Sequence, residues 1–223
     1  TAISITNSEH IDGLFLDGNI KVLTAYAERQ IGKEKKAATI AGYHEMMTQL
    51  RKEMQPEDLM LSNIIRARLP EAGLECMEYF DGSYLENFEL PIGMSKADYL
   101  VKGIDAFQQA AKEGKIIAMT LGLGESSADE SGIDDTRIKF DDLDGVQDTL
   151  DYYIALFLVC AERYSYLNIH DGYNVGSIGR KGRPNYKASE SKVWLKRFSE
   201  YDKPLGKPKG PATKEGYVYT REF

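Results

Sequence analysis

The sequence has few of the residues that build metal centres and disulfide frameworks. Its 223 residues include two cysteines, Cys76 and Cys160, and three histidines. The cysteines lie far apart, without the CxxC spacing of zinc sites, and both stand in apolar surroundings, LECMEYF and FLVCAERY. We therefore predict two buried thiols that pack as small hydrophobic side chains. The sequence predicts no metal site and no cofactor.

Long hydrophobic runs and an excess of basic residues are also absent. The longest apolar stretch, residues 152–161, is shorter than the about 18 residues that a membrane-spanning helix needs. The formal net charge is −7, whereas a protein that grips phosphate backbones needs a basic surface. We therefore expect no membrane and no nucleic acid as partners. The N-terminus lacks the regions of a signal peptide, but a mature or truncated chain lacks them too, so a secreted or periplasmic location stays open.

Strand-like runs alternate with helical patterns along the whole chain. Helices are predicted where apolar residues recur three and four apart, and Ser95 with Asp98 has the spacing of a helix-capping box. The predicted helices cover residues 33–54, 95–111 and 146–161, and the predicted strands cover residues 13–17, 58–65, 83–86, 115–124 and 164–173. Repeated strand–helix units without hairpin signals indicate an α/β fold with a parallel sheet.

Polar residues stand at the ends of these strands. They are Asp17, Asn63, Glu86, Asn168, His170 and Asp171. A dinucleotide-binding sheet should open with GxGxxG, which the GLGES segment at residues 122–126 does not match. A TIM barrel instead assembles its site from several strand ends. We therefore predict a TIM-type (β/α) barrel, as a partial barrel of about five βα units where a closed barrel needs eight. A strand-like run, YVYTREF at residues 217–223, predicts a further strand at the C-terminus.

Two phrases of the sequence follow one template. IDGLFLDGN at residues 11–19 and FDGSYLENF at residues 80–88 each end a strand-like run on a carboxylate, Asp17 or Glu86. Glycoside hydrolases typically use two catalytic carboxyl groups on opposite sides of a cleft. The alternative is that Asp-Gly forms turns and that the carboxylates cap the helices that follow. Asp12 and Asp81, at the other end of these strands, are expected to form turns.

The two phrases resemble strand-end motifs of bacterial TIM-barrel glycoside hydrolases, a loose group similar to the polygalactosaminidase-like barrels. The C-terminal KPLGKPKGPATKEGYVYTREF, residues 203–223, is similar to the tail that closes such barrels before a β-rich segment. The resemblance implies further barrel strands on the N-terminal side and catalytic roles for Asp17 and Glu86. We therefore expect residues 1–223 to be one α/β domain, the C-terminal portion of a (β/α)8 barrel. A smaller open sheet is the alternative.

These observations lead to one functional hypothesis and two rivals. The hypothesis is a glycoside hydrolase acting on a polysaccharide or oligosaccharide, with Glu86 as general acid and Asp17 as nucleophile or base. The residues expected to contact the sugar are Asn63, Asn168, His170, Asp171 and Tyr173. One rival uses Asp17, Asn63 and Glu86 as magnesium ligands for enolase-type chemistry. The other is a barrel fragment that only binds carbohydrate, or that assembles with a second copy to complete the fold.

Overall fold

The computed structural model describes residues 10–17, 25–67, 69, 71–86, 95–122, 144–170 and 197–223. The chain divides into two compact units. Unit 1 comprises Thr1–Ala118 with Glu162–Ser165, and unit 2 comprises Met119–Ala161 with Tyr166–Phe223. Each unit is described by itself, and the expectation of a single domain over residues 1–223 stays a prediction.

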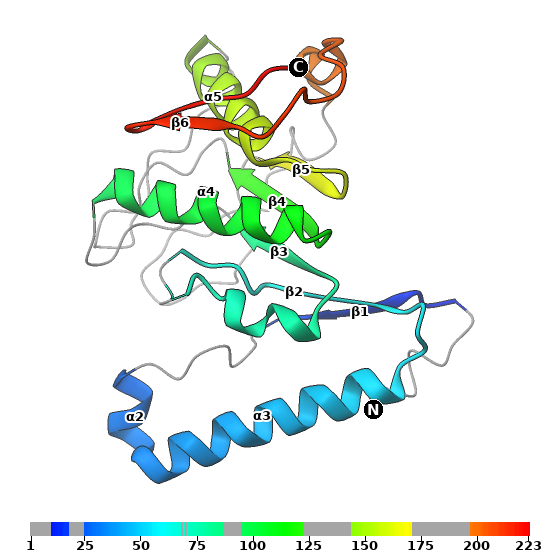
Figure 1. The fold of residues 1–223 in the computed structure, drawn as a ribbon, viewed down its shortest axis with the longest axis vertical. Coiled ribbons are helices and arrows are strands. Elements are labelled where there is room, and N and C mark those ends of the chain that lie inside the picture. The colour runs from blue at the N-terminus through cyan, green and yellow to red at the C-terminus, as the bar shows by residue number, and fades with distance from the viewer. Residues whose placement is uncertain are drawn as a thin grey trace, which may run out of the picture. The chain divides into compact units, whose positions relative to one another are not determined.

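Five strands form one sheet in the order β1-β2-β3-β4-β5 (Figure 1). They are β1 (Gly13–Leu16), β2 (Leu59–Ser62), β3 (Gly82–Glu86), β4 (Ile116–Gly122) and β5 (Ser165–His170). The pairs β1–β2 and β2–β3 are parallel. All five predicted strands are therefore present, in an α/β fold, while closure into a barrel stays a prediction.

The helices follow the strands largely as the periodicity predicts. The described helices are α2 (Ala25–Ile31), α3 (Lys33–Glu53), α4 (Lys96–Lys112) and α5 (Asp144–Cys160), with the 3-10 helices η1 (Leu74–Tyr79) and η2 (Ser199–Asp202). Ser95 is confirmed as the N-cap of α4, because its hydroxyl accepts a hydrogen bond from the Asp98 N–H at 3.1 Å; the hydroxyl also donates to the Asp98 carboxylate at 2.7 Å. No helix in the described ranges is long and apolar enough to cross a membrane.

Each unit has its own buried core. In unit 1 the fully buried side chains include Met47 of α3, Met60 of β2 and Phe107 of α4. In unit 2 Leu150, Ile169 and Phe198 form one apolar cluster. Both cysteines are buried and free, as predicted.

The glycines of the two matched phrases stand where neighbouring backbones approach most closely. A Cβ atom at Gly13 would lie 2.1 Å from the carbonyl oxygen of Leu59, the first residue of β2. A Cβ atom at Gly82 would lie 2.2 Å from the carbonyl oxygen of Ile116, the first residue of β4. Only glycine fits at either position. The repeated Asp-Gly therefore starts two strands and does not form the expected turns.

The backbone of the aspartate before each glycine makes the same contact. The carbonyl of Asp12 accepts a hydrogen bond from the N–H of Leu59, and the carbonyl of Asp81 accepts one from the N–H of Ile116, both at 2.8 Å. These bonds join the start of each phrase to the start of the next strand in the sheet. The Asp-Gly pair of each phrase thus has a structural role, at the N-terminal ends of the strands.

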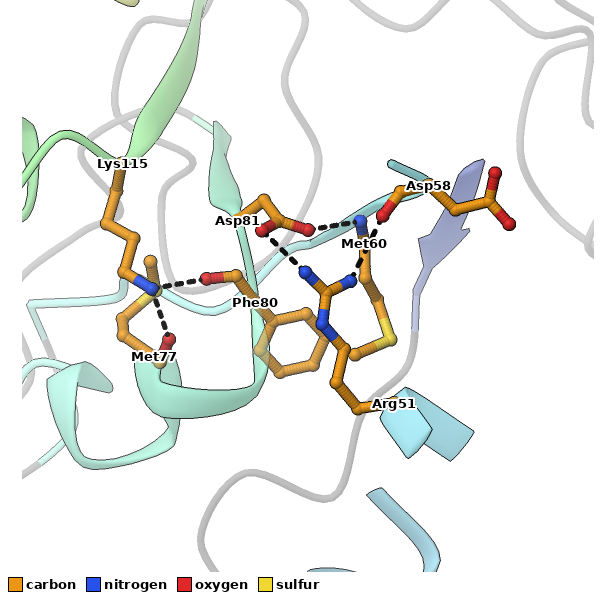
Figure 2. A network of polar contacts seen from close by, with 7 residues as sticks. All are labelled: Arg51, Asp58, Met60, Met77, Phe80, Asp81 and Lys115. Atoms are coloured by element: carbon orange, nitrogen blue, oxygen red, sulfur yellow. Dashed lines mark hydrogen bonds and ion pairs between the residues drawn. The ribbon is translucent and has the colours of Figure 1, made fainter. Parts of the chain in front are cut away.

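The Asp81 side chain belongs to a polar network at this end of the sheet (Figure 2). Its carboxylate accepts a hydrogen bond from the N–H of Met60 at 2.8 Å and forms an ion pair with Arg51 at 2.7 Å. Arg51 also donates to the carbonyl of Asp58 at 3.1 Å. Lys115 donates to the carbonyls of Met77 and Phe80, at 3.1 and 2.6 Å. Asp81 therefore joins α3 to the starts of β2 and β3 and stabilises them.

The C-terminal tail contains an antiparallel hairpin, of which the sequence predicted one strand, within residues 217–223. Strand β6 (Thr213–Glu215) pairs with β7 (Val218–Thr220), and Gly216 in the turn has φ 61°. A two-residue turn with positive φ suits glycine and matches the twist of paired strands. The first strand and the pairing were missed because β6 is short and fully exposed, so it shows no apolar alternation.

Tyr43 of α3 provides a stability test for the core of unit 1. Its ring packs edge-on against Tyr79, with centroids 6.3 Å apart, and its buried hydroxyl has no hydrogen-bond partner among the described residues. Burial, with smaller contributions from Cys76 and Tyr79, raises the pKa of Tyr43 to about 12. We expect Tyr43→Phe to raise the free energy of unfolding by about 1 kcal/mol, because an unpaired buried hydroxyl is removed.

The pH dependence of the same variant follows from the raised pKa. The folded state favours the neutral phenol of Tyr43. The contribution of this group to the free energy of unfolding is therefore complete below the ordinary pKa of 10.0 and is lost as the pH rises through about 12. Urea unfolding at alkaline pH should therefore show a shallower loss of stability for Tyr43→Phe than for the wild type. A loss of more than about 2 kcal/mol at neutral pH would mean that the hydroxyl makes a stabilising hydrogen bond.

Candidate functional site

The C-terminal ends of β1, β2 and β3 bring two predicted site residues together in unit 1. Leu16 pairs with Ser62, and Ser62 pairs with Ser83. Asp17 follows Leu16 directly, and Asn63 follows Ser62 directly. The two residues therefore end neighbouring parallel strands at the same level of the sheet. Asp17 is exposed, whereas Asn63 is buried, with 3% of its surface accessible.

The pleat of the strands places these positions on one face. Phe15 pairs with Leu61, and Leu61 pairs with Gly82, so these three residues share a face of the sheet. Positions two residues apart along a strand share a face. Asp17 is two positions after Phe15, Asn63 is two positions after Leu61, and Glu86 is two positions after Tyr84, which itself follows Gly82 by two. Only the backbone of Glu86, the last residue of β3, is described.

Two aromatic rings meet on this face. Phe15 of β1 and Tyr84 of β3 lie edge to face, with centroids 5.9 Å apart and an interplanar angle of 88°. Their strands flank β2, and alternate strands in a sheet are about 9.5 Å apart. The rings therefore span β2, and they stand two positions before Asp17 and Glu86 respectively.

Two buried serines on the opposite face hold the strand ends. The Ser62 hydroxyl donates to the carbonyl of Leu16, the residue before Asp17. The Ser83 hydroxyl accepts hydrogen bonds from the N–H groups of Ile64 and Ile65, at 3.2 and 3.0 Å, immediately after Asn63. These N–H groups lie beyond the end of β2, where no neighbouring strand is registered with them. The serines therefore fix the backbone on either side of the candidate site.

All the hydrogen-bonding positions of the Ser83 hydroxyl are occupied. It also donates to the carbonyl of Tyr84 at 2.8 Å, so its single donor and two acceptor positions are all occupied. We expect Ser83→Ala to lower the free energy of unfolding by about 1–3 kcal/mol, since the buried N–H of Ile65 loses its acceptor, while that of Ile64 keeps the carbonyl of Ser62 at 3.0 Å. Denaturant unfolding measures this change. The exposed Ser199, changed to Ala, is the control and should alter stability by less than about 0.5 kcal/mol.

The remaining predicted residues belong to unit 2 or lie outside the described residues. Asn168 is half-buried on β5, on the face opposite Ile169, which packs in the cluster with Leu150. His170 ends β5, and only its backbone is described. Asp171 and Tyr173 lie outside the described residues, so their expected contacts with sugar stay predictions.

Sequence reasoning missed several residues that position this region. Ser62 follows the apolar run LML of β2, and Ser83 lies between Gly82 and Tyr84 of β3, so a small polar residue inside a strand was the available signal. Arg51 gave no signal, because nothing in the sequence connects a basic residue of α3 with an aspartate before β3. Among the described residues, no group of three or more His, Cys, Asp or Glu side chains is placed to hold a metal ion.

The sequence of the chain was compared with known proteins and protein families. No curated protein matches the sequence. A family match covers residues 1–223, which is the full length, and the family is described as hypothetical glycosyl hydrolase family 15. The chain therefore belongs to hypothetical glycosyl hydrolase family 15.

Proposed function

We propose that this protein hydrolyses glycosidic bonds and that Asp17 and Glu86 are its catalytic carboxyl groups. The observation that carries the proposal is the register of β1, β2 and β3, in which both positions follow the same alternation at the same ends of the strands. Membership of a glycosyl hydrolase family supports the reaction class. A hydrolase of this kind needs two carboxyl groups that flank one bond.

The two carboxyl groups have different roles in the proposed reaction. Glu86 protonates the leaving oxygen as general acid, and Asp17 either attacks the anomeric carbon or activates a water molecule. The exposed position of Asp17 allows substrate or water to reach it. In this proposal Asn63 orients a sugar hydroxyl group, and the hydrogen bonds of Ser83 to the next two residues support its position. Contacts of Asn168, His170, Asp171 and Tyr173 of unit 2 with a sugar are a separate part of the proposal.

We also propose that the sheet is part of a TIM-type barrel whose interior is the face with Phe15 and Leu61. The strands of parallel sheets are normally buried on both faces. On this face, however, Phe15 is 53% exposed and Leu59 is 41% exposed. Contact between Phe15 and Tyr84, from alternate strands, is the kind of layer that fills a barrel interior. Further strands would bury these side chains.

A screen against a panel of polysaccharides tests the proposal. Purified protein is incubated with each polymer, and new reducing ends are measured with and without a chelator. We expect release from at least one polymer, at the same rate in both conditions. Activity that disappears with the chelator and returns with magnesium would favour the enolase-type alternative. Binding without any release would favour a carbohydrate-binding protein.

A further inference from the structure

The C-terminal tail presents a strong positive charge on a protein that is negatively charged overall. Residues 203–214, here called the lysine ribbon, have the sequence KPLGKPKGPATK, with four lysines and no acidic residue. The whole chain has a formal net charge of −7. Lys203, Lys207 and Lys209 are exposed, and so is every residue between them. Charge of one sign is therefore concentrated in a short accessible segment.

Hydrogen bonds hold the lysine ribbon in place within unit 2. The N–H of Lys209 donates to the carbonyl of Glu222 at 2.9 Å, and the Arg221 Nε donates to the carbonyl of Gly210 at 3.1 Å. The Arg221 Nη1 also donates to the carbonyls of Leu158 and Ala161, at the end of α5. Arg221 thus joins the ribbon to a helix whose last carbonyls need donors.

Proline stiffens the same segment. Three of the seven prolines of the chain lie in the ribbon, at positions 204, 208 and 211. Proline fixes φ, so the backbone loses less conformational freedom when a ligand binds. The lysines are therefore carried on a backbone that is largely ordered before binding.

The lysines of the ribbon are not neutralised by carboxylates in the described part of the chain. Lys203, Lys207 and Lys209 form no ion pair there, whereas the nearby Asp202 is paired with Arg197. Lys214 lies over the ring of Tyr219, with its Nζ 5.4 Å from the centroid. Three exposed ammonium groups are thus available to an external anion.

We propose that the lysine ribbon binds an anionic polysaccharide, one that carries carboxylate or sulfate groups. Lysine ammonium groups act as point charges that tolerate varied anion geometry, as a flexible polymer requires. Exposed apolar rings and side chains nearby, Tyr201, Leu205 and Tyr217, offer surfaces to the faces of sugar rings. The class of ligand follows from membership of a glycosyl hydrolase family, and the proposal does not depend on Asp17 or Glu86.

Affinity gel electrophoresis of the full chain tests the proposal. The gels contain polygalacturonate, dextran sulfate, uncharged dextran or single-stranded DNA, at about 0.02 M and about 0.3 M salt. Lys203, Lys207 and Lys209 are changed together to Glu. The matched control changes Lys33, Lys35 and Lys52 to Glu, because these exposed lysines of α3 alter the net charge by the same amount. Thermal unfolding confirms that both variants are folded.

The expected result is retardation of the wild type by polygalacturonate or dextran sulfate at low salt, with little retardation at high salt or by dextran. The ribbon variant should bind at least about 10-fold more weakly, since three charge contacts are reversed, and the α3 variant should bind as the wild type does. The two anionic polymers distinguish carboxylate from sulfate recognition. The proposal is overturned if neither polymer retards the wild type, if the ribbon variant binds normally, or if DNA binds as tightly as the polysaccharides.

Discussion

Replacing Glu86 with Gln should reduce the hydrolysis of a polysaccharide by at least about 100-fold while leaving its binding unchanged. The amide keeps the size of the side chain but cannot donate a proton to the leaving oxygen. The loss should be much smaller with an aryl glycoside, because a phenolate leaving group needs little protonation. Initial rates on both substrates, together with the dissociation constant for the polysaccharide, measure the effect.

The control for this experiment is Glu75→Gln, an exposed carboxylate of η1 outside the candidate site. It should leave both rates and the affinity unchanged. Equal losses on the two substrates would show that Glu86 is not the general acid. Full activity of Glu86→Gln on the polysaccharide would remove it from the catalytic pair.

Replacing Gly82 with Ala should cost more than about 3 kcal/mol of unfolding free energy. The added Cβ would lie 2.2 Å from the carbonyl oxygen and 2.6 Å from the Cβ of Ile116, so β3 and β4 would have to move apart. Their pairing includes the hydrogen bond from the Ile116 N–H to the carbonyl of Asp81. Denaturant unfolding should show a large fall in midpoint, or a protein that no longer folds.

Gly42→Ala is the matched control for this substitution. Gly42 lies inside α3, and a Cβ atom there would meet nothing within 4 Å. Alanine is favoured over glycine in a helix by about 1 kcal/mol, so this variant should be slightly more stable than the wild type. If Gly82→Ala is no less stable than Gly42→Ala, the close approach of β3 and β4 described here is incorrect.

Much of the fold could be predicted because its signals are local. The strands are short apolar runs, and the helices α3, α4 and α5 show apolar residues three and four apart, with an N-cap at Ser95. The helices α2 and η1 and the strand β6 were missed, whereas β7 lies in the predicted C-terminal strand. They are short or lack an apolar stripe, so tertiary contacts such as those of Arg221 determine them.

The candidate site was predicted only in part, for a physical reason. A polar side chain at the end of a strand is visible in the sequence, and the alternation of side chains assigns it a face, as for Asp17 and Asn63. The contacts that position the strand ends are long-range. Ser62 bonds to Leu16 and Ser83 to Ile64, and these pairs become neighbours only when the register is known. The predicted strand at residues 13–17 includes Gly13, but the close contacts of Gly13 and Gly82 were not foreseen, because Leu59 and Ile116 are distant in sequence.

The most direct test of the catalytic assignment is the product that Asp17→Ala forms in the presence of azide. Removal of the carboxylate should abolish hydrolysis of the polysaccharide or of an activated glycoside. Azide is a small nucleophile that can enter the vacated space and attack the anomeric carbon in place of the carboxylate or its water. Mass spectrometry should therefore detect a glycosyl azide, formed by Asp17→Ala and not by the wild type. Hydrolysis by Asp17→Ala at the wild-type rate without azide would contradict the assignment of Asp17 and Glu86 as the catalytic pair.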